Sequence, residues 1–185
     1  MTRTLVLGGA RSGKSAYAER LAAQSGKEVI YVATAAAGDG EMAQRIALHR
    51  AQRPAQWKTV EEKLALAQVL ATWRAAHRLV LVDCLTLWLS NLLFHDGTVY
   101  PDVGAIELPA RLHDERAALL AELAEPRGDV IFVSNEVGMG IVPYGAITRA
   151  YTDEAGRLNQ AVAALCDRAV FVAAGLPLVL KGAPC

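Results

Sequence analysis

The sequence predicts an α/β fold in which one mostly parallel β-sheet is flanked by helices. Short runs rich in β-branched and aromatic residues alternate with longer Ala- and Leu-rich stretches of helical periodicity. The run Leu79–Val82 is apolar throughout, which is typical of a strand buried on both faces. The chain has 185 residues, of which 53% are hydrophobic and 21% charged. We therefore expect a single domain over residues 1–185 with a sizeable core.

Each expected element follows from its local pattern. Strands are expected at Thr4–Gly8, Glu28–Thr34, Lys58–Val60, Leu79–Asp83, Asp129–Asn135, Ala169–Ala174 and Pro177–Leu180. Helices are expected near 14–25, 40–53, 61–76, 105–124 and 154–166. In the last helix, Leu158, Val162 and Leu165 recur at the spacing of one buried face. Glycine and proline predict loops at 95–108 and 135–145, and the second directly follows a strand, where α/β enzymes bind ligands.

Composition excludes several classes of protein. The 19 Lys and Arg residues balance the 19 Asp and Glu residues, so the net charge favours neither nucleic acid nor anionic membranes as partners. Cys84, Cys166 and Cys185 show no metal-binding or paired spacing, so we expect reduced thiols and a cytoplasmic location. The N-terminal apolar stretch is too short for a signal peptide, and no apolar run predicts a membrane span.

Residues 8–15 match the phosphate-binding pattern G-x-x-x-x-G-K-[ST] between a predicted strand and a predicted helix. They are Gly8, Gly9, Ala10, Arg11, Ser12, Gly13, Lys14 and Ser15. Backbone N–H groups of such a loop bind phosphate oxygens, assisted by the helix N-terminus. Lys14 would reach the β- and γ-phosphates, and the Ser15 hydroxyl would bind Mg²⁺. An ordinary glycine-rich turn is the weaker interpretation, because every fixed position and the context match.

A second Mg²⁺ ligand is expected where an apolar strand ends. Asp83 follows Leu79–Val82 and is the candidate, binding the ion directly or through water. The alternative is an aspartate that caps the next helix, a position that this residue type also favours.

His49 lies on the predicted helix 40–53 among Arg45, Arg50 and Arg53, and arginine is the residue type that binds phosphates in a bidentate manner. A neutral imidazole can attack phosphorus and form a phosphoramidate, and cationic neighbours keep it neutral by lowering its pKa. From these residues alone, a structural histidine at the border between apolar and charged surface is the stronger interpretation.

Six strings along the chain add a more specific signal. They are the loop 8–15, Tyr-Val-Ala-Thr at 31–34, Glu-Met-Ala-Gln-Arg-Ile-Ala-Leu-His-Arg at 41–50, Arg-Pro-Ala-Gln-Trp at 53–57, Asn-Glu-Val-Gly-Met-Gly-Ile-Val-Pro at 135–143 and Ala-Gly-Arg-Leu-Asn-Gln at 155–160. Together they resemble the bifunctional adenosylcobinamide kinase/adenosylcobinamide-phosphate guanylyltransferase family over essentially the whole chain. The string 135–143 combined with His49 is the most specific part.

The resemblance implies a P-loop NTPase fold with a RecA-like sheet, a homotrimer and two reactions of cobalamin (vitamin B12) biosynthesis. ATP or GTP would phosphorylate the aminopropanol hydroxyl of adenosylcobinamide. GTP would then donate GMP to a histidine with loss of pyrophosphate, and the GMP would pass to adenosylcobinamide phosphate, giving adenosylcobinamide-GDP. By position, His49 is the guanylylated histidine. The resemblance implies nucleotide contacts from Thr34, Ala35, Ala36, Arg50, Ala51, Gln52, Arg53, Glu61 and Asp83.

Two other functions remain open from the residues alone. A single-function P-loop kinase for another small metabolite would keep the phosphate loop and Asp83 and make His49 structural. A nucleotide-gated binding module, such as a RecA-like or GTPase switch, would need a responsive partner surface, and the balanced charge offers none for nucleic acid. The loop 135–143 is expected on the corrinoid side of the site.

Overall fold

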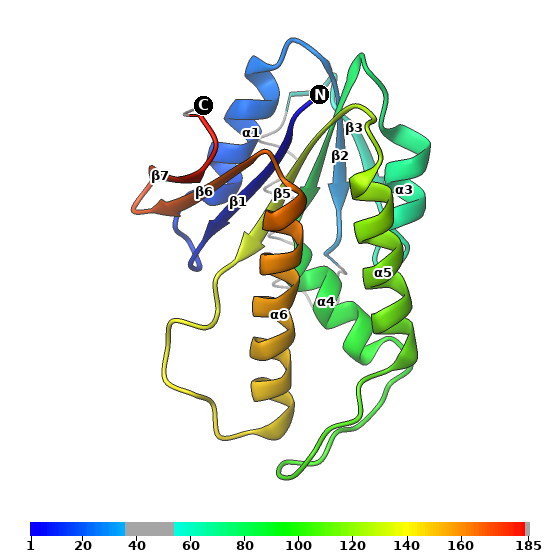
Figure 1. The fold of residues 1–185 in the computed structure, drawn as a ribbon, viewed down its shortest axis with the longest axis vertical. Helices are drawn as coiled ribbons and strands as arrows, with labels where there is room; N and C mark the ends of the chain where they lie inside the picture. Colours follow the sequence, from blue (N-terminus) through cyan, green and yellow to red (C-terminus); the bar gives the residue numbers. More distant parts are fainter. Residues whose placement is uncertain (36–53, 184–185) are drawn as a thin grey trace.

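The computed structural model describes residues 1–35 and 54–183 of the chain. Its strands form one sheet in the order β3-β2-β4-β5-β1-β6-β7, and all are parallel except β7, which pairs antiparallel with β6 (Figure 1). The strands are β1 (Arg3–Gly8), β2 (Glu28–Ala33), β3 (Lys58–Glu61), β4 (Arg78–Asp83), β5 (Asp129–Asn135), β6 (Arg168–Ala173) and β7 (Leu176–Lys181). This sheet confirms the predicted fold class.

The helices cover the two faces of the sheet unequally. Among the described residues, α1 (Lys14–Gln24) packs alone on one face, and the opposite face carries α3 (Leu66–Trp73), α4 (Leu85–Phe94), α5 (Ala110–Ala124) and α6 (Ala146–Leu165). Successive strand residues point to opposite faces, so Leu5 joins the core under α3–α6 while Val6 joins the core under α1. The apolar strands are thus buried on both sides, as their sequence predicts.

Helix α4 was not predicted, and its composition explains why. Leu85, Trp88, Leu89, Leu92 and Leu93 are all buried and form one stripe, but Leu87 and Phe94 add apolar residues on the less buried side. Apolar residues on both sides of a helix weaken the contrast between its faces, and surface helices are recognised from that contrast. It packs between β5 and the helices α5 and α6.

Three other helices differ from their predicted bounds. Helix α3 begins at Leu66 and not near 61, because the Glu62 carboxylate accepts hydrogen bonds from the N–H groups of Leu64 and Ala65 and turns the chain first. Helix α5 begins only after Pro109. Helix α6 begins at Ala146, well before the predicted start at 154. The predicted helix 40–53 lies outside the described residues.

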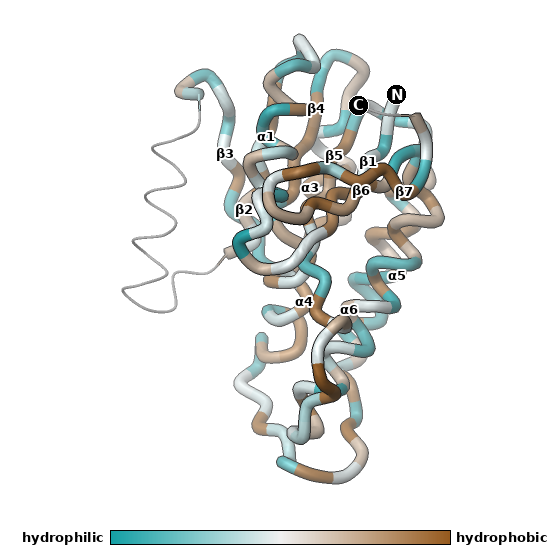
Figure 2. Tube along the Cα trace, turned by 90° about the vertical axis from the view of Figure 1, so that its left-hand side faces the viewer, coloured by the Kyte–Doolittle hydropathy of each residue, from teal (hydrophilic) through white to brown (hydrophobic). Residues whose placement is uncertain are grey.

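The carboxyl ends of the parallel strands meet at one edge of the sheet, the lower edge in Figure 1. There Asp83 is in register with Val133, and Gly8 is in register with Asn135. Figures 1 and 2 show α4, the first half of α6 and the connecting loops extending beyond this edge. Ligands of open α/β sheets bind at the carboxyl edge, so this is where a site is expected.

Candidate active site

The phosphate loop connects β1 to α1, in the context that the sequence predicts. Arg11 (φ 54°) and Gly13 (φ 94°) both adopt left-handed backbone conformations, which turn the chain tightly into the helix. Gly13 is the N-cap of α1; no side chain caps the helix, and its first turn contains no acidic residue. The N–H groups at the start of α1 are therefore available to an anion, and the helix dipole favours one there.

Close packing against the β6–β7 hairpin fixes this loop. A Cβ on Gly8 would lie 2.4 Å from the Val172 carbonyl oxygen and 2.5 Å from Ser12 Oγ, so no larger residue fits. The Gly175 N–H donates to the Ser12 carbonyl at 2.8 Å. The Ser12 hydroxyl is buried and has no hydrogen-bond partner among the described residues. An unpaired polar group inside a glycine cradle fits a loop that binds phosphate.

Lys14 lies folded over the loop. The residue is 8% exposed, and its ammonium donates to the Gly9 carbonyl at 3.1 Å. Burial lowers the pKa of Lys14, and the carboxylate of Asp83 opposes that shift. Lys14 and Asp83 are thus close enough to interact electrostatically, although they belong to different strand–helix units. Asp83 ends β4 and Lys14 begins α1, so both lie at the carboxyl edge of the sheet, beside the cradle where a triphosphate would bind.

A hydrogen bond orients the Asp83 side chain. The hydroxyl of Tyr31, on the neighbouring strand β2, donates to Asp83 Oδ2 at 3.0 Å. The capping alternative is not found, since the N-cap of α4 is Cys84 and no side chain caps that helix. Hydroxyl and carboxylate oxygens are suitable ligands for Mg²⁺, so the donors offered by Ser15 and Asp83 fit the ion. Residues 1–35 and 54–183 contain no group of three or more His, Cys, Asp or Glu side chains that could hold a metal.

Thr34 hydrogen-bonds to the backbone of the residue that follows Asp83. It is fully buried, and its hydroxyl donates to the Cys84 carbonyl and accepts from the Cys84 N–H, both at 2.7 Å. Its own carbonyl accepts from Asn91 at 2.8 Å. The Thr34 side chain therefore positions the backbone that follows Asp83. Ala35 follows it and is half-buried.

Glu61 lies at the carboxyl end of β3, where it is exposed and in register with Ala33. Strand β2 separates it from the strand that carries Asp83. Two strand spacings correspond to about 10 Å. This separation of Glu61 from Asp83 along the sheet edge would allow Glu61 to contact the nucleoside of a nucleotide whose phosphates lie at the phosphate loop.

The remaining site predictions concern residues outside the described ranges. They are the predicted nucleophile His49 and the predicted nucleotide contacts Ala36, Arg50, Ala51, Gln52 and Arg53. These stay predictions from the sequence and its resemblance.

The structure adds a polar network that sequence reasoning missed. Asn135, at the end of β5, donates through Nδ2 to Thr86 Oγ1 at 2.8 Å, and its carbonyl accepts from Asn159 Nδ2 at 3.3 Å. Asn159 Oδ1 in turn accepts from Ser134 at 2.7 Å. This network joins α4, β5 and α6 between the phosphate loop and Asp83. The polar residues Ser134 and Asn135 at the end of a buried strand were a possible sequence signal. Their partners Thr86 and Asn159 come from distant segments, so the sequence alone does not identify them.

Comparison with known proteins agrees with this geometry. Residues 4–180 match the family model described as cobinamide kinase / cobinamide phosphate guanyltransferase. A Pseudomonas aeruginosa protein named bifunctional adenosylcobalamin biosynthesis protein CobP is 58% identical over 98% of this chain and 99% of its own length. The Escherichia coli K12 protein of the same description, CobU, is 39% identical over 96% of this chain and 98% of its own.

Solved structures resemble this chain in fold alone. An ATPase of a bacterial type III secretion system aligns with a TM-score of 0.57 at 14% identity, over 96% of this chain and 56% of that one. The flagellar accessory protein FlaH of Methanocaldococcus jannaschii aligns with a TM-score of 0.50 at 14% identity, over 98% and 78%. The predicted fold of a mostly parallel sheet flanked by helices is confirmed, and the chain belongs to the cobinamide kinase / cobinamide phosphate guanyltransferase family.

Proposed function

We propose that one nucleotide site, built around the phosphate loop, serves both reactions of this enzyme. The protein is an adenosylcobinamide kinase and adenosylcobinamide-phosphate guanylyltransferase of cobalamin biosynthesis. The observation that carries the proposal is the buried Lys14, which folds over the phosphate loop at the uncapped start of α1. The match of residues 4–180 to a bifunctional family does not favour a kinase with a single function.

In the kinase step, ATP or GTP binds with its β- and γ-phosphates on the loop N–H groups and the start of α1. The substrate hydroxyl attacks the γ-phosphorus, the nucleoside diphosphate leaves, and the hydroxyl proton passes to phosphate or solvent. Lys14 stabilises the negative charge on the transferring group, which is the main contribution a protein makes to this chemistry. Mg²⁺, held by Ser15 and Asp83, would supply further neutralisation of phosphate charge. Tyr31 keeps the Asp83 carboxylate oriented.

In the guanylyl step, a neutral nitrogen of His49 attacks the α-phosphorus of GTP and pyrophosphate leaves. A phosphate oxygen of adenosylcobinamide phosphate then attacks the same phosphorus, and the histidine is released. The proposal rests on the position of His49 within the string 41–50 and on its arginine neighbours. Glu61 and the segment 50–53 contact the nucleoside.

Covalent labelling tests this assignment. Protein and Mg²⁺ are incubated with GTP labelled at the α-phosphate and then denatured. We expect a label that survives alkali and is lost in mild acid, as for a phosphoramidate, and that is absent from His49→Ala. The matched control is His113→Ala, which removes an exposed histidine from α5 and should label as the wild type does. No label on protein shown to bind GTP would favour a single-function kinase.

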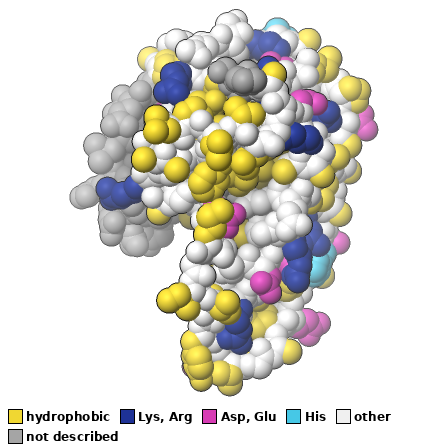
Figure 3. Space-filling model, turned by 60° about the vertical axis from the view of Figure 1, so that its left-hand side comes forward, with side chains coloured by type: hydrophobic (Ala, Val, Ile, Leu, Met, Phe, Trp, Pro, Cys, Tyr) yellow, Lys and Arg dark blue, Asp and Glu magenta, His cyan; other side chains and the backbone are white. Residues whose placement is uncertain are grey.

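We further propose a homotrimer working in the cytoplasm, where ATP and GTP are supplied. The resemblance supports the trimer, and so does the edge strand β7, which exposes Leu176, Leu178 and Leu180 on one face (Figure 3). Within the described residues, no helix is both long enough and apolar enough to cross a membrane. Light scattering measures the assembly: a monomer mass at micromolar concentration would contradict the trimer.

A further inference from the structure

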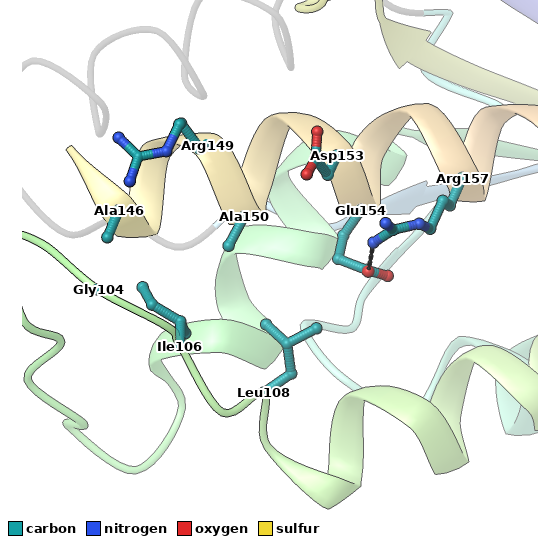
Figure 4. A pocket seen from close by; sticks show the side chains of 9 residues that line it. All are labelled: Gly104, Ile106, Leu108, Ala146, Arg149, Ala150, Asp153, Glu154 and Arg157. Atoms are coloured by element: carbon teal, nitrogen blue, oxygen red, sulfur yellow. Dashed lines mark hydrogen bonds and ion pairs between the residues drawn. The ribbon is translucent and has the colours of Figure 1, made fainter. Parts of the chain in front are cut away.

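A hollow of about 250 Å³ lies between the first half of α6 and the segment 104–108 (Figure 4). Figure 4 shows Ala146, Ala150 and Glu154 on the side of α6 that faces Ile106 and Leu108. Arg149, Asp153 and Arg157 recur at every fourth position of the same helix and form a charged row beside that apolar floor. The hollow therefore combines an apolar bottom with a polar rim.

The walls of the hollow are held in place. Glu154 is only 4% exposed, and its two carboxylate oxygens accept hydrogen bonds from Arg116 of α5, at 2.6 Å, and from Arg157. The Ala146 N–H donates to the Asp102 carbonyl at 2.9 Å, which ties the opposite wall to the start of α6. A buried carboxylate that is bonded on both oxygens is a rigid part of the structure. The hollow is thus a formed site.

The charges on the rim define the ligand chemistry. The carboxylate of Asp153 is exposed and offers a hydrogen-bond acceptor to solvent. The side chain of Arg157 bonds to Glu154 but is still 61% exposed, so its other N–H groups offer donors. A cationic ligand at this rim would be repelled by the arginines, and an anionic ligand would be repelled by Asp153. A neutral group that both donates and accepts, such as a primary amide, satisfies both kinds of side chain.

The surface next to the hollow is apolar and leads to the phosphate loop. The loop 136–145 starts beside that loop, where the Glu136 N–H donates to the Gly8 carbonyl at 3.1 Å. It then exposes Val137, Met139, Ile141, Val142 and Tyr144 (Figure 3). Arg149 holds the end of this loop through the carbonyls of Pro143 and Tyr144. A large ring with an apolar face and amide arms would match this combination of surfaces.

We propose that the hollow on α6 binds an amide-bearing side arm of the corrin ring of adenosylcobinamide, while the apolar loop 136–145 contacts the ring itself. This inference rests on the proposed function. It makes Asp153 and Arg157 specificity residues that hold the corrinoid while its aminopropanol arm reaches the phosphate loop. The site is separate from the nucleotide site, so its loss should weaken corrinoid binding and leave nucleotide chemistry intact.

Two variants test the proposal. Ala150→Leu fills the floor of the hollow, and Ala164→Leu makes the same change at an exposed position of the same helix. Asp153→Ala removes the rim acceptor, and Asp114→Ala on α5 is its exposed control. Calorimetry measures the Kd for adenosylcobinamide, kinase assays measure KM for adenosylcobinamide and for GTP, and GMP labelling measures the guanylyl step without corrinoid.

We expect Ala150→Leu to raise the Kd and KM for adenosylcobinamide at least ten-fold, and Asp153→Ala to raise them several-fold. KM for GTP and GMP labelling should be unchanged, and both controls should behave as wild type. Circular dichroism checks folding, and Asp153→Ala decides the matter if Ala150→Leu unfolds. Unchanged corrinoid binding in a folded variant overturns the proposal. Failure of the proposed function looks different, because the wild type itself would then neither phosphorylate adenosylcobinamide nor label with GMP.

Discussion

The phosphate loop and the hollow on α6 are built in opposite ways. The loop comprises eight consecutive residues, and backbone packs against backbone so closely that a Cβ on Gly8 would overlap the Val172 carbonyl. The hollow is lined by residues from the segment 104–108 and from α6, side chains form its walls, and Arg116 of α5 supports it through its hydrogen bond to Glu154. One region is a compact cradle for a common chemical group, and the other is an open surface for a particular substrate.

This difference indicates how each region responds to change. The cradle binds phosphate largely through backbone groups and one desolvated lysine, so it tolerates little alteration of shape or charge. The hollow uses exposed side chains whose loss removes single contacts. Substitutions should therefore separate the two regions by the size of their effect and by the substrate that they affect.

The largest effect is expected from Lys14→Ala. Removing the buried ammonium beside Asp83 should lower kcat/KM for the kinase step by about 100- to 1,000-fold, the range measured for a lost charge-stabilising group. Thermal stability should not fall, since the wild type bears the cost of burying this cation. Kinase assays and melting curves measure both. Lys27→Ala, which removes a cation paired with Asp129 away from the site, is the control and should retain activity.

Gly8→Ala tests whether backbone packing fixes the cradle. The new methyl group would lie 2.4 Å from the Val172 carbonyl, so we expect about 2–3 kcal/mol lower free energy of unfolding from overpacking. Gly9→Ala is the matched control, because no atom lies within 4 Å of its added Cβ. Urea titrations compare the two. Equal stabilities would show that the loop is looser than the close packing indicates.

Tyr31→Phe tests the orientation of Asp83 with a smaller expected effect. Loss of the hydroxyl removes one hydrogen bond to Oδ2, a contribution of about 1 kcal/mol. We expect the Mg²⁺ concentration for half-maximal activity to rise by a factor of about five. Calorimetric titration of Mg²⁺ into the nucleotide-bound protein gives a second readout. Tyr100→Phe, whose hydroxyl donates to the Leu93 carbonyl, should leave both values unchanged.

The smallest effect lies at the amino edge of the sheet, away from both regions. The hydrogen bond from Arg3 lowers the pKa of Asp167 below its ordinary value of 3.8. A lowered carboxylate pKa stabilises the fold above that value, and the gain is lost as pH falls through the folded-state pKa. Asp167→Asn should therefore lose about 0.5 kcal/mol at pH 7, as for a solvent-screened ion pair. The difference in melting temperature from wild type should shrink as pH falls below about 3.8 and vanish below the lower, folded-state pKa of Asp167. A constant difference at all pH values would contradict this assignment.

The sequence by itself determined the fold class, the phosphate loop and the family. Buried parallel strands are continuous apolar runs, and the loop pattern is contiguous, so both can be recognised from short windows. Asp83 was also predicted, because it directly ends such a run. Helix α4 was missed, because Leu87 and Phe94 place apolar residues on its less buried side and weaken the contrast between its faces.

Only the tertiary structure decided how distant residues meet. Register between β2 and β4 brings Tyr31 to Asp83 and the Thr34 hydroxyl to the Cys84 backbone. Packing of α5 against α6 brings Arg116 to Glu154 and leaves the hollow beside them. Such contacts depend on the register of strands and on the packing of helices far apart in the chain. The local sequence pattern carries no information about either, whereas a loop of eight consecutive residues can be recognised from its own residues.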